Sequence, residues 1–228
     1  FDYEPFFERD SARLLGNIAQ YVREGGALAM LGGDRSFDLG KYGGTAVADV
    51  LPVQLGVPGD PVDIAAFSPV LTEAGARHPV TRLVGDVGEN AALWARLPPM
   101  HGTNLTLGAV PGAGVLLAHP SRNAGEAALP ILAVRQVGLG RTLALTVDSS
   151  WRWSFAQAAR GGGNQAYLRF WKAAMRWLVG DPDDQAVLLE LPRENVEPGE
   201  LLRVTARVRD AGFGPVVGAT VVGSVTGP

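Results

Sequence analysis

Apolar residues recur at helical spacing in two segments of the chain, residues 11–23 and 164–179. This spacing gathers the apolar side chains on one face of a helix, and burial of that face stabilises it. Gly25-Gly26 follows the first segment and Gly180 the second, which is typical of helix ends. In the second helix, the predicted buried stripe consists of Tyr167, Leu168, Trp171, Ala174, Met175 and Leu178.

Short apolar runs between the two helices predict β-strands. Residues 27–31 directly follow the first helix, and a helix followed by a strand is typical of a parallel βαβ unit. Residues 130–137 and 141–147 flank the turn Gly138-Leu139-Gly140, which predicts a β-hairpin. The order of these elements predicts an α/β fold. Extended segments are also expected at 53–55, 62–71 and 114–118, with a short helix at 45–50 and a short helix or turn at 89–97.

The pattern changes after residue 182. Apolar and polar residues alternate at 187–191, 201–208 and 219–225, with turn residues between these runs. Short strands at this spacing are typical of a β-sandwich, but about 40 residues are too few to close one. We therefore expect an α/β domain over residues 1–182 and a small all-β, partial immunoglobulin-like segment over 183–228. Its open strand edges could lie on the α/β domain or pair with a second molecule in a dimer.

Composition narrows the classes of partner and cofactor. The 228 residues include 20 Lys and Arg and 23 Asp and Glu, which gives a net charge of −3. The chain has no cluster of basic residues, so nucleic acid is not expected as a partner. The absence of cysteine excludes disulfides, thiolate metal sites and a thiol nucleophile. No zinc, calcium or nucleotide motif is present, so no metal or cofactor is expected. No apolar run reaches the length of about 18 residues that a membrane-spanning helix needs.

Two separated motifs carry a resemblance to a known family. Residues 25–53 contain two glycines, a strand that ends in Met-Leu-Gly-Gly, then Ser-Phe, Tyr-x-x-Thr and Leu-Pro-Val. Residues 134–153 contain Gly-x-Gly-Arg and then Asp-Ser-Ser-Trp-Arg-Trp. In this order the motifs resemble the glutamine-amidotransferase-like domains of large bacterial proteins, over residues 1–182. The resemblance implies a flavodoxin-like three-layer sandwich of the class I amidotransferase type.

The resemblance does not extend to the catalytic residues of a working glutaminase. Such enzymes carry a Cys in a Gly-x-Cys-x-Gly turn and a His-x-Glu pair, whereas this chain has no Cys and has His119-Pro120-Ser121. Related domains often adjoin von Willebrand factor type A domains and membrane helices in bacterial envelope proteins. The resemblance therefore implies a domain without glutaminase activity in a larger, membrane-associated protein. From the ends at Phe1 and Pro228 we expect a soluble fragment of such a protein, with its compartment left open.

Candidate site residues follow two of the predicted strands. The turn Gly32-Gly33-Asp34-Arg35-Ser36 could present N–H groups to an anion or oxyanion; alternatively, its glycines only allow a sharp turn. The segment 148–153 suits either a ligand pocket or a structural role in capping and covering the sheet edge. The predicted ligand-binding residues are Gly32, Gly33, Asp34, Ser36, Tyr42, Asp148, Ser149, Trp151 and Arg152.

Three functions remain open on these residues. The first is a binding or scaffold module for other domains of the same longer chain or for another protein. The second is a hydrolase with Ser36, His119 and Asp148 as a catalytic triad, although no Gly-x-Ser-x-Gly turn surrounds Ser36. The third is a structural spacer. Hydrogen bonds that join the side chains of Ser36, His119 and Asp148 would favour the hydrolase. Of the remaining histidines, His78 precedes a proline, and His101 lies in a predicted loop rich in proline and glycine.

Overall fold

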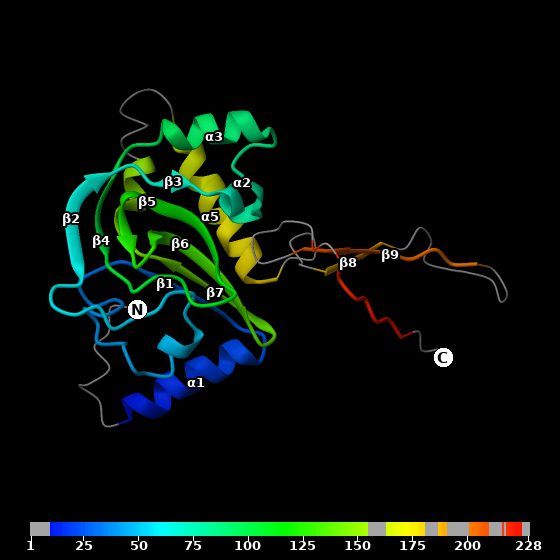
Figure 1. The fold of residues 1–228 in the computed structure, drawn as a ribbon, viewed down its shortest axis with the longest axis horizontal. Helices are drawn as coiled ribbons and strands as arrows, with labels where there is room; N and C mark the ends of the chain where they lie inside the picture. The colour runs from blue at the N-terminus through cyan, green and yellow to red at the C-terminus, as the bar shows by residue number, and fades with distance from the viewer. Residues whose placement is uncertain are drawn as a thin grey trace.

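A mixed five-stranded sheet forms the centre of the molecule (Figure 1). The computed structural model describes residues 10–154, 163–180, 187–190, 201–209, 216 and 218–224. Only the first two strands of the sheet order run parallel, and every other neighbouring pair is antiparallel. In spatial order the strands are β1 (Ala27–Leu31), β7 (Gly140–Leu145), β6 (Ala127–Val137), β5 (Gly114–Ala124) and β3 (Val70–Leu71).

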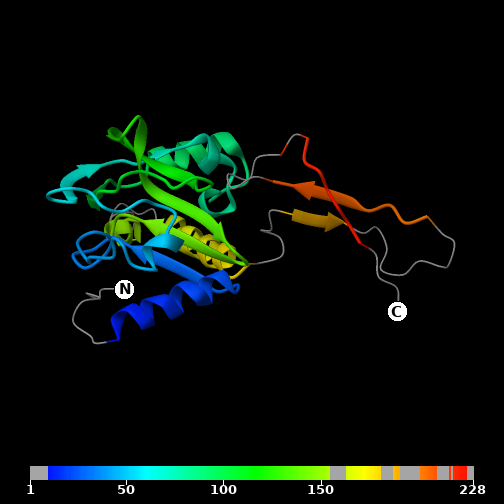
Figure 2. The same cartoon turned by 60° about the horizontal axis from the view of Figure 1, so that its bottom comes forward.

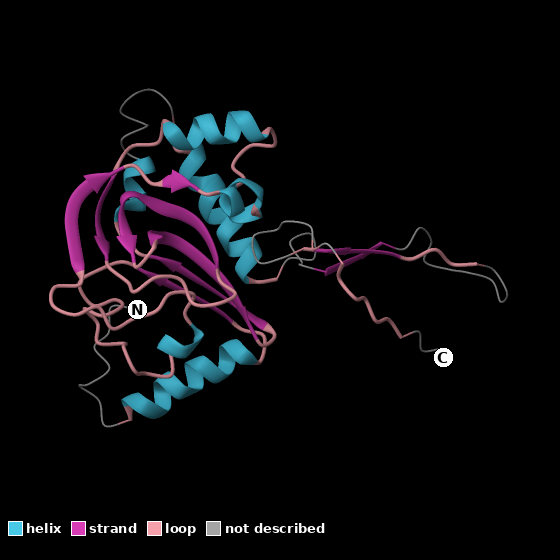
Figure 3. Ribbon diagram, viewed as in Figure 1, coloured by secondary structure: helices cyan, strands magenta, loops and turns pink. Residues whose placement is uncertain are grey.

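Helices cover both faces of this sheet. Helix α1 (Ser11–Arg23) lies on one face, and α5 (Gln165–Leu178) lies on the other with α2 (Glu73–Arg77) and α3 (Val87–Ala95) (Figure 3). Within β1, alternate residues point to opposite faces, as strand geometry requires. Leu28 and Met30 join the core under α1, whereas Ala27 and Ala29 pack against the core under α5. The α/β, flavodoxin-like three-layer fold is therefore confirmed.

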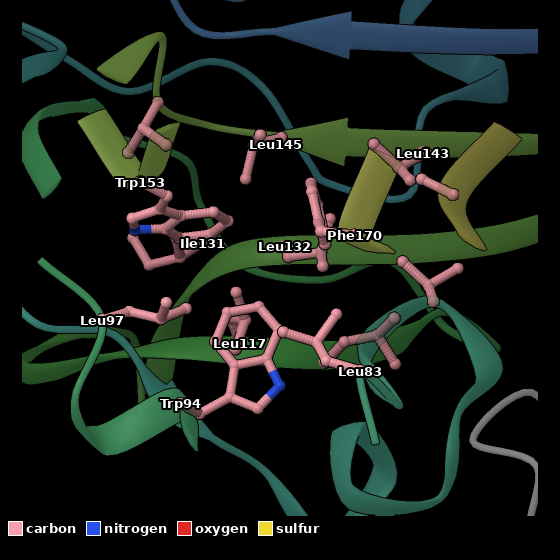
Figure 4. Close-up of a cluster of buried hydrophobic side chains, with 14 of the residues drawn as sticks. Leu83, Trp94, Leu97, Leu117, Ile131, Leu132, Leu143, Leu145, Trp153 and Phe170 are labelled. Carbon is pink, nitrogen blue, oxygen red and sulfur yellow. The ribbon is translucent and has the colours of Figure 1, made fainter. Parts of the chain in front are cut away.

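The larger core lies between the sheet and α5 and is rich in aromatic rings (Figure 4). The ring centroids of Trp153 and Phe170 lie 5.5 Å apart at an interplanar angle of 87°, and those of Trp153 and Trp94 lie 5.4 Å apart at 85°. These are the edge-to-face arrangements that aromatic quadrupoles favour. The buried indole N–H of Trp153 donates to the carbonyl of Pro98 at 3.2 Å. Trp153, the last residue of the second family motif, is thus a core residue.

Several predicted elements are confirmed at nearly the expected bounds: α1, β1, the β6–β7 hairpin, α3 and α5. The predicted helix at 45–50 is wrong, because only a 3₁₀ turn, η1 (Ala48–Val50), forms before Pro52. At 53–55 the extended segment reduces to one bridge between Val53 and Ala109. The segment 62–71 divides into β2 (Val62–Phe67) and β3.

Two further elements differ from the sequence-based expectation. His101 lies on a strand, β4 (Met100–Asn104), rather than in a loop, and β4 pairs with β2 in a separate antiparallel sheet. Two 3₁₀ turns, η2 (Pro79–Thr81) and η3 (Ser149–Trp151), complete the connections.

The buried face of α5 is rotated from the predicted stripe. Leu168 and Met175 are exposed, and the buried residues are Ala166, Phe170, Ala174, Trp177 and Leu178. Apolar residues occupy two neighbouring stripes of this helix, so periodicity alone fits either face. The stripe that contains Phe170 and Trp177 faces the sheet, and Tyr167 and Trp171 pack at its border as partly buried residues.

Beyond α5, a two-stranded ribbon extends away from the α/β body (Figure 2). It consists of β8 (Val187–Glu190) and β9 (Thr205–Val208) in antiparallel register. Residues 219–224 form no strand, so the expected third strand is wrong within the part of 219–225 that the structure describes. Residue 225 lies outside the described residues. The proposed boundary between residues 182 and 183 stays a prediction.

Candidate ligand-binding site

The carboxyl ends of β1 and β7 lie side by side, and the two family motifs meet there. Leu31 pairs with Leu145, and the chain continues into Gly32-Gly33 on one strand and Thr146-Val147-Asp148 on the other. The Gly32 N–H donates to the Leu145 carbonyl at 2.8 Å. A Cβ atom on Gly32 would lie 2.6 Å from the Thr146 carbonyl oxygen, so only glycine fits this close approach.

Asn104, at the end of β4, closes this edge of the sheet. Its Oδ1 accepts the Gly33 N–H at 3.0 Å, and its Nδ2 donates to the Gly33 carbonyl at 3.2 Å. The backbone N–H of Asn104 donates to the Thr146 carbonyl at 2.8 Å. The amide side chain therefore acts as a short additional strand beside Gly33. The Gly33 N–H, which the sequence offered as an anion-binding group, already has a protein acceptor.

A buried pair of hydroxyls reinforces the junction between β4 and β7. The Oγ1 atoms of Thr103 and Thr146 lie 2.8 Å apart, and Thr103 Oγ1 also donates to the Thr146 carbonyl at 3.2 Å. Thr146 Oγ1 can in turn donate to the Pro130 or Ile131 carbonyl on β6. This network fixes β4 against the main sheet, because buried polar groups without such partners would be costly.

A hollow of about 290 Å³ opens over this junction. Its walls come from the turn after β1, from β2 and β4, and from the segment after β7. Asp34 and Asp148 contribute exposed carboxylates, and His101 contributes an exposed imidazole. Ile64, with 87% of its surface exposed, stands on the β2 side. The lining residues are Gly33, Asp34, Leu39, Val62, Ile64, His101, Gly102, Thr103, Asn104, Thr146, Val147 and Asp148.

The structure thus brings together three of the predicted ligand-binding residues, Gly33, Asp34 and Asp148, in one hollow. Ser36 is buried below it, and its hydroxyl would lie 3.5 Å from a Cβ atom on Gly33. Tyr42 is in the core under α1.

The remaining predicted residues lie on or next to η3. The buried Ser149 accepts the His101 N–H at 2.9 Å, which ties η3 to β4. Trp151 is half exposed, and the Arg152 guanidinium lies over its ring at 5.6 Å from the centroid. Ser149 therefore supports a wall of the hollow, whereas the cation–π pair is not part of its lining.

His119 occupies a separate place on β5. Its Nδ1 accepts the backbone N–H groups of Ser121 at 3.2 Å and Arg122 at 3.0 Å, and its Nε2 has no hydrogen-bond partner among the described residues. Neither ring nitrogen is therefore bonded to Ser36 or Asp148. Burial lowers the pKa of His119, although the nearby Asp63 charge opposes that shift. The ring packs on Phe67, with centroids 4.3 Å apart.

Asp63, next to His119, is a structural carboxylate. It accepts the Ala65 N–H at 2.9 Å and forms an ion pair with Arg122. The hydrogen bond from Ala65 and the Arg122 guanidinium hold the pKa of the Asp63 carboxyl below its usual value. The ion pair links β2 to the irregular part of β5, whereas the hydrogen bond from Ala65 lies within β2.

The sequence did not point to Asn104, His101 or Ile64. His101 and Asn104 lie on β4 and Ile64 lies on β2, and these two strands pair although more than thirty residues separate them in the sequence. The five residues of β4 show no regular alternation of apolar and polar side chains that would have predicted this strand.

Within the described residues, no group of three or more His, Asp or Glu side chains is arranged to hold a metal ion. In the same part of the chain, no helix is long and apolar enough to cross a membrane.

Comparisons with known proteins agree with this architecture. A family model described as "Putative glutamine amidotransferase" (GATase1-like) matches residues 7–180. Among solved structures, the cytoplasmic protein STM3548 from Salmonella typhimurium is 25% identical with a TM-score of 0.55, over 72% of this chain. The cytoplasmic protein STM1381 from Salmonella typhimurium LT2 is also 25% identical over 72% of this chain, with a TM-score of 0.52.

The chain matches only part of each of these relatives, 59% of the first and 60% of the second. No curated protein matches the chain. The family model nevertheless covers most of the sequence, including both motifs and the strands that carry the hollow. This chain belongs to the glutamine-amidotransferase-like (GATase1-like) family.

Proposed function

We propose that this domain is a binding module that uses the hollow at the carboxyl ends of β1 and β7 and does not hydrolyse glutamine. The observation that carries the proposal is the pairing of Asn104 with both polar groups of the Gly33 peptide. At the strand end where an open N–H could stabilise an oxyanion, the N–H is already bonded within the protein. The sequence also has no cysteine to act as a nucleophile.

The hydrolase alternative has less support from the arrangement of side chains. A serine nucleophile needs a base within hydrogen-bond reach and an orienting group behind that base. Nδ1 of His119 is engaged by two backbone N–H groups, and Nε2 has no partner in the described part of the chain. Ser36 is 4% exposed, so a substrate would have to displace the turn above it.

The setting of the module follows from the family resemblance. We propose that it serves a larger, membrane-associated bacterial protein as a scaffold for other domains of that chain or for a separate protein. The β8–β9 ribbon supports a role in association, because Val187 and Leu189 on β8 are both at least half exposed. Exposed apolar side chains on a two-stranded ribbon favour packing against another surface, including that of a second copy.

The first test is a measurement of glutamine hydrolysis by the purified protein, with ammonia release as the readout. We expect no turnover above the rate without protein. A nitrophenyl acetate assay with the wild type and Ser36→Ala tests the hydrolase alternative in parallel. Glutamine turnover, or ester turnover that Ser36→Ala abolishes while the variant keeps its fold by circular dichroism, would refute a purely binding role.

A further inference from the structure

Several backbone N–H groups at the hollow beside Gly33 are bonded within the protein, and two aspartates are exposed on its walls. The backbone N–H groups of four residues around it are donated within the protein: Gly32, Gly33, His101 and Asn104. Anion sites in proteins depend on several N–H groups that point at the ligand. Because these four are already bonded, they cannot compensate an anion for its lost hydration.

The charged side chains on the walls of the hollow favour a cation rather than an anion. Asp34 follows β1 and Asp148 follows β7, so a carboxylate reaches the hollow from each of the two parallel strands. Among the described lining residues, none is Lys or Arg. Two like charges on one partly enclosed surface raise the local concentration of cations and favour hydrogen-bond donors.

We propose that this hollow binds the cationic group of an organic ligand, an ammonium or a guanidinium, with Asp34 and Asp148 as its acceptors. The inference rests on the binding role proposed above and names the chemical class of its ligand. A metal ion is less well matched, because no group of three His, Asp or Glu side chains in the described residues is arranged to hold one.

The apolar wall fits the stem that such a cation carries. Ile64 is almost fully exposed, and Leu39 and Val62 also line the hollow. The methylene chain of a lysine, an arginine or a small amine can cover these side chains while its charged end lies between the carboxylates. Within the described residues β2 pairs only with β4, so its other edge is open to an extended peptide.

The test uses amide chemical shifts of the whole chain, measured by NMR during titration with four probes. Two probes are guanidinium compounds: N-acetyl-arginine-amide and agmatine. N-acetyl-glutamine-amide and N-acetyl-glutamate-amide are the neutral and anionic controls. We expect saturable shifts at Gly33, Gly102 and Asp148 with the two cations, weakened by salt, and none that saturate with the controls. Tighter binding of the arginine derivative would identify a peptide side chain as the source of the cation; equal binding would identify a free amine.

Substitutions of Asp34 and Asp148 test whether their carboxylates bind the cationic probes. The double variant Asp34→Asn and Asp148→Asn should weaken cation binding by about tenfold or more, since both charge-assisted bonds become neutral. Glu126→Gln, an exposed acid in the turn between β5 and β6, is the matched control and should leave the affinity unchanged. Both aspartates are exposed, so the double variant should keep the amide spectrum of the folded protein away from the hollow.

Three results would overturn the inference: no saturable shift with either cation, equal binding of the glutamate derivative, or full affinity in the double variant. Saturable binding of the anionic probe would refute the cation assignment and leave the binding role intact. Glutamine turnover in the ammonia assay would instead refute the binding role itself, so the two proposals fail in distinguishable ways.

Discussion

Protonation of His78 should make the stability of this domain fall steeply below neutral pH. The His78 side chain lies between α2 and η2 and is completely buried. Its ring centroid is 5.3 Å from that of Trp177, and its Nδ1 accepts the Val80 N–H at 3.2 Å. Burial, with a smaller contribution from the Arg141 charge, lowers the pKa of His78 from 6.5 to about 3.

The lowered pKa fixes the sign of the effect. Between pH 6.5 and about 3, the unfolded chain binds a proton at His78 and the folded chain does not. The contribution of neutral His78 is therefore fully present above pH 6.5 and is lost as the pH falls toward the folded-state pKa. Each pKa unit corresponds to about 1.4 kcal/mol, so the loss is roughly 2 kcal/mol by about pH 5 and at most about 5 kcal/mol in all.

Urea unfolding followed by tryptophan fluorescence at several pH values measures this loss. His78→Asn is the informative variant, because the amide oxygen of asparagine can replace Nδ1 as the acceptor for Val80. It should be less stable than the wild type at neutral pH but should lose about 1.4 kcal/mol less per pH unit below pH 6. His101→Asn, which alters an exposed histidine, is the control and should follow the wild-type curve. Parallel wild-type and His78→Asn curves would refute the assignment of the proton to His78, since His119 and Asp63 are common to both proteins.

Three further substitutions test the parts of the fold that position the hollow, each by the urea midpoint and by the amide shift of Gly33. Asn104→Ala should cost about 1–3 kcal/mol and move the Gly33 amide signal, because it removes both hydrogen bonds to that peptide; an unchanged signal would contradict the pairing. Gly32→Ala should cost about 1–3 kcal/mol or more, because its Cβ would meet the Thr146 carbonyl oxygen at 2.6 Å; wild-type stability would contradict the close approach of β1 to β7. Trp153→Ala should cost about 3–5 kcal/mol with little effect on cation binding, since the indole is wholly buried in the core; loss of binding in a folded variant would place this residue in the site instead.

The elements that the sequence predicted well are those specified by nearby residues. Helix α1 has an apolar stripe and a glycine stop, and the β6–β7 hairpin has two strands joined at Gly138, whose φ is +61°. In each case the determining interactions lie within a few residues, so spacing and turn chemistry are sufficient. The face that α5 buries was not determined in this way. It depends on which aromatic residues fit the sheet, and that choice involves residues far along the chain.

The part of the candidate site that follows β1 and β7 could be predicted from the sequence, whereas the part on β4 could not. Gly33, Asp34 and Asp148 directly follow strands, and the ends of parallel neighbouring strands must meet at one sheet edge. Asn104 reaches that edge from β4, which belongs to another sheet, and its hydrogen-bond partner Gly33 is 71 residues away in sequence. No spacing rule connects such positions, and the amide of Asn104 reverses the expected chemistry of the turn by occupying its N–H group.

Asn104 also links the architecture to the chemistry of the hollow. Its backbone N–H bonds to Thr146 beyond β7, and its side chain bonds to Gly33 beyond β1, so one residue holds both parallel strand ends. The same bonds occupy the Gly33 N–H, which an oxyanion could otherwise use, whereas Asp34 and Asp148 remain exposed. We therefore expect that a cysteine introduced at this turn would not confer glutamine hydrolysis, because the oxyanion of the tetrahedral intermediate would lack the Gly33 N–H.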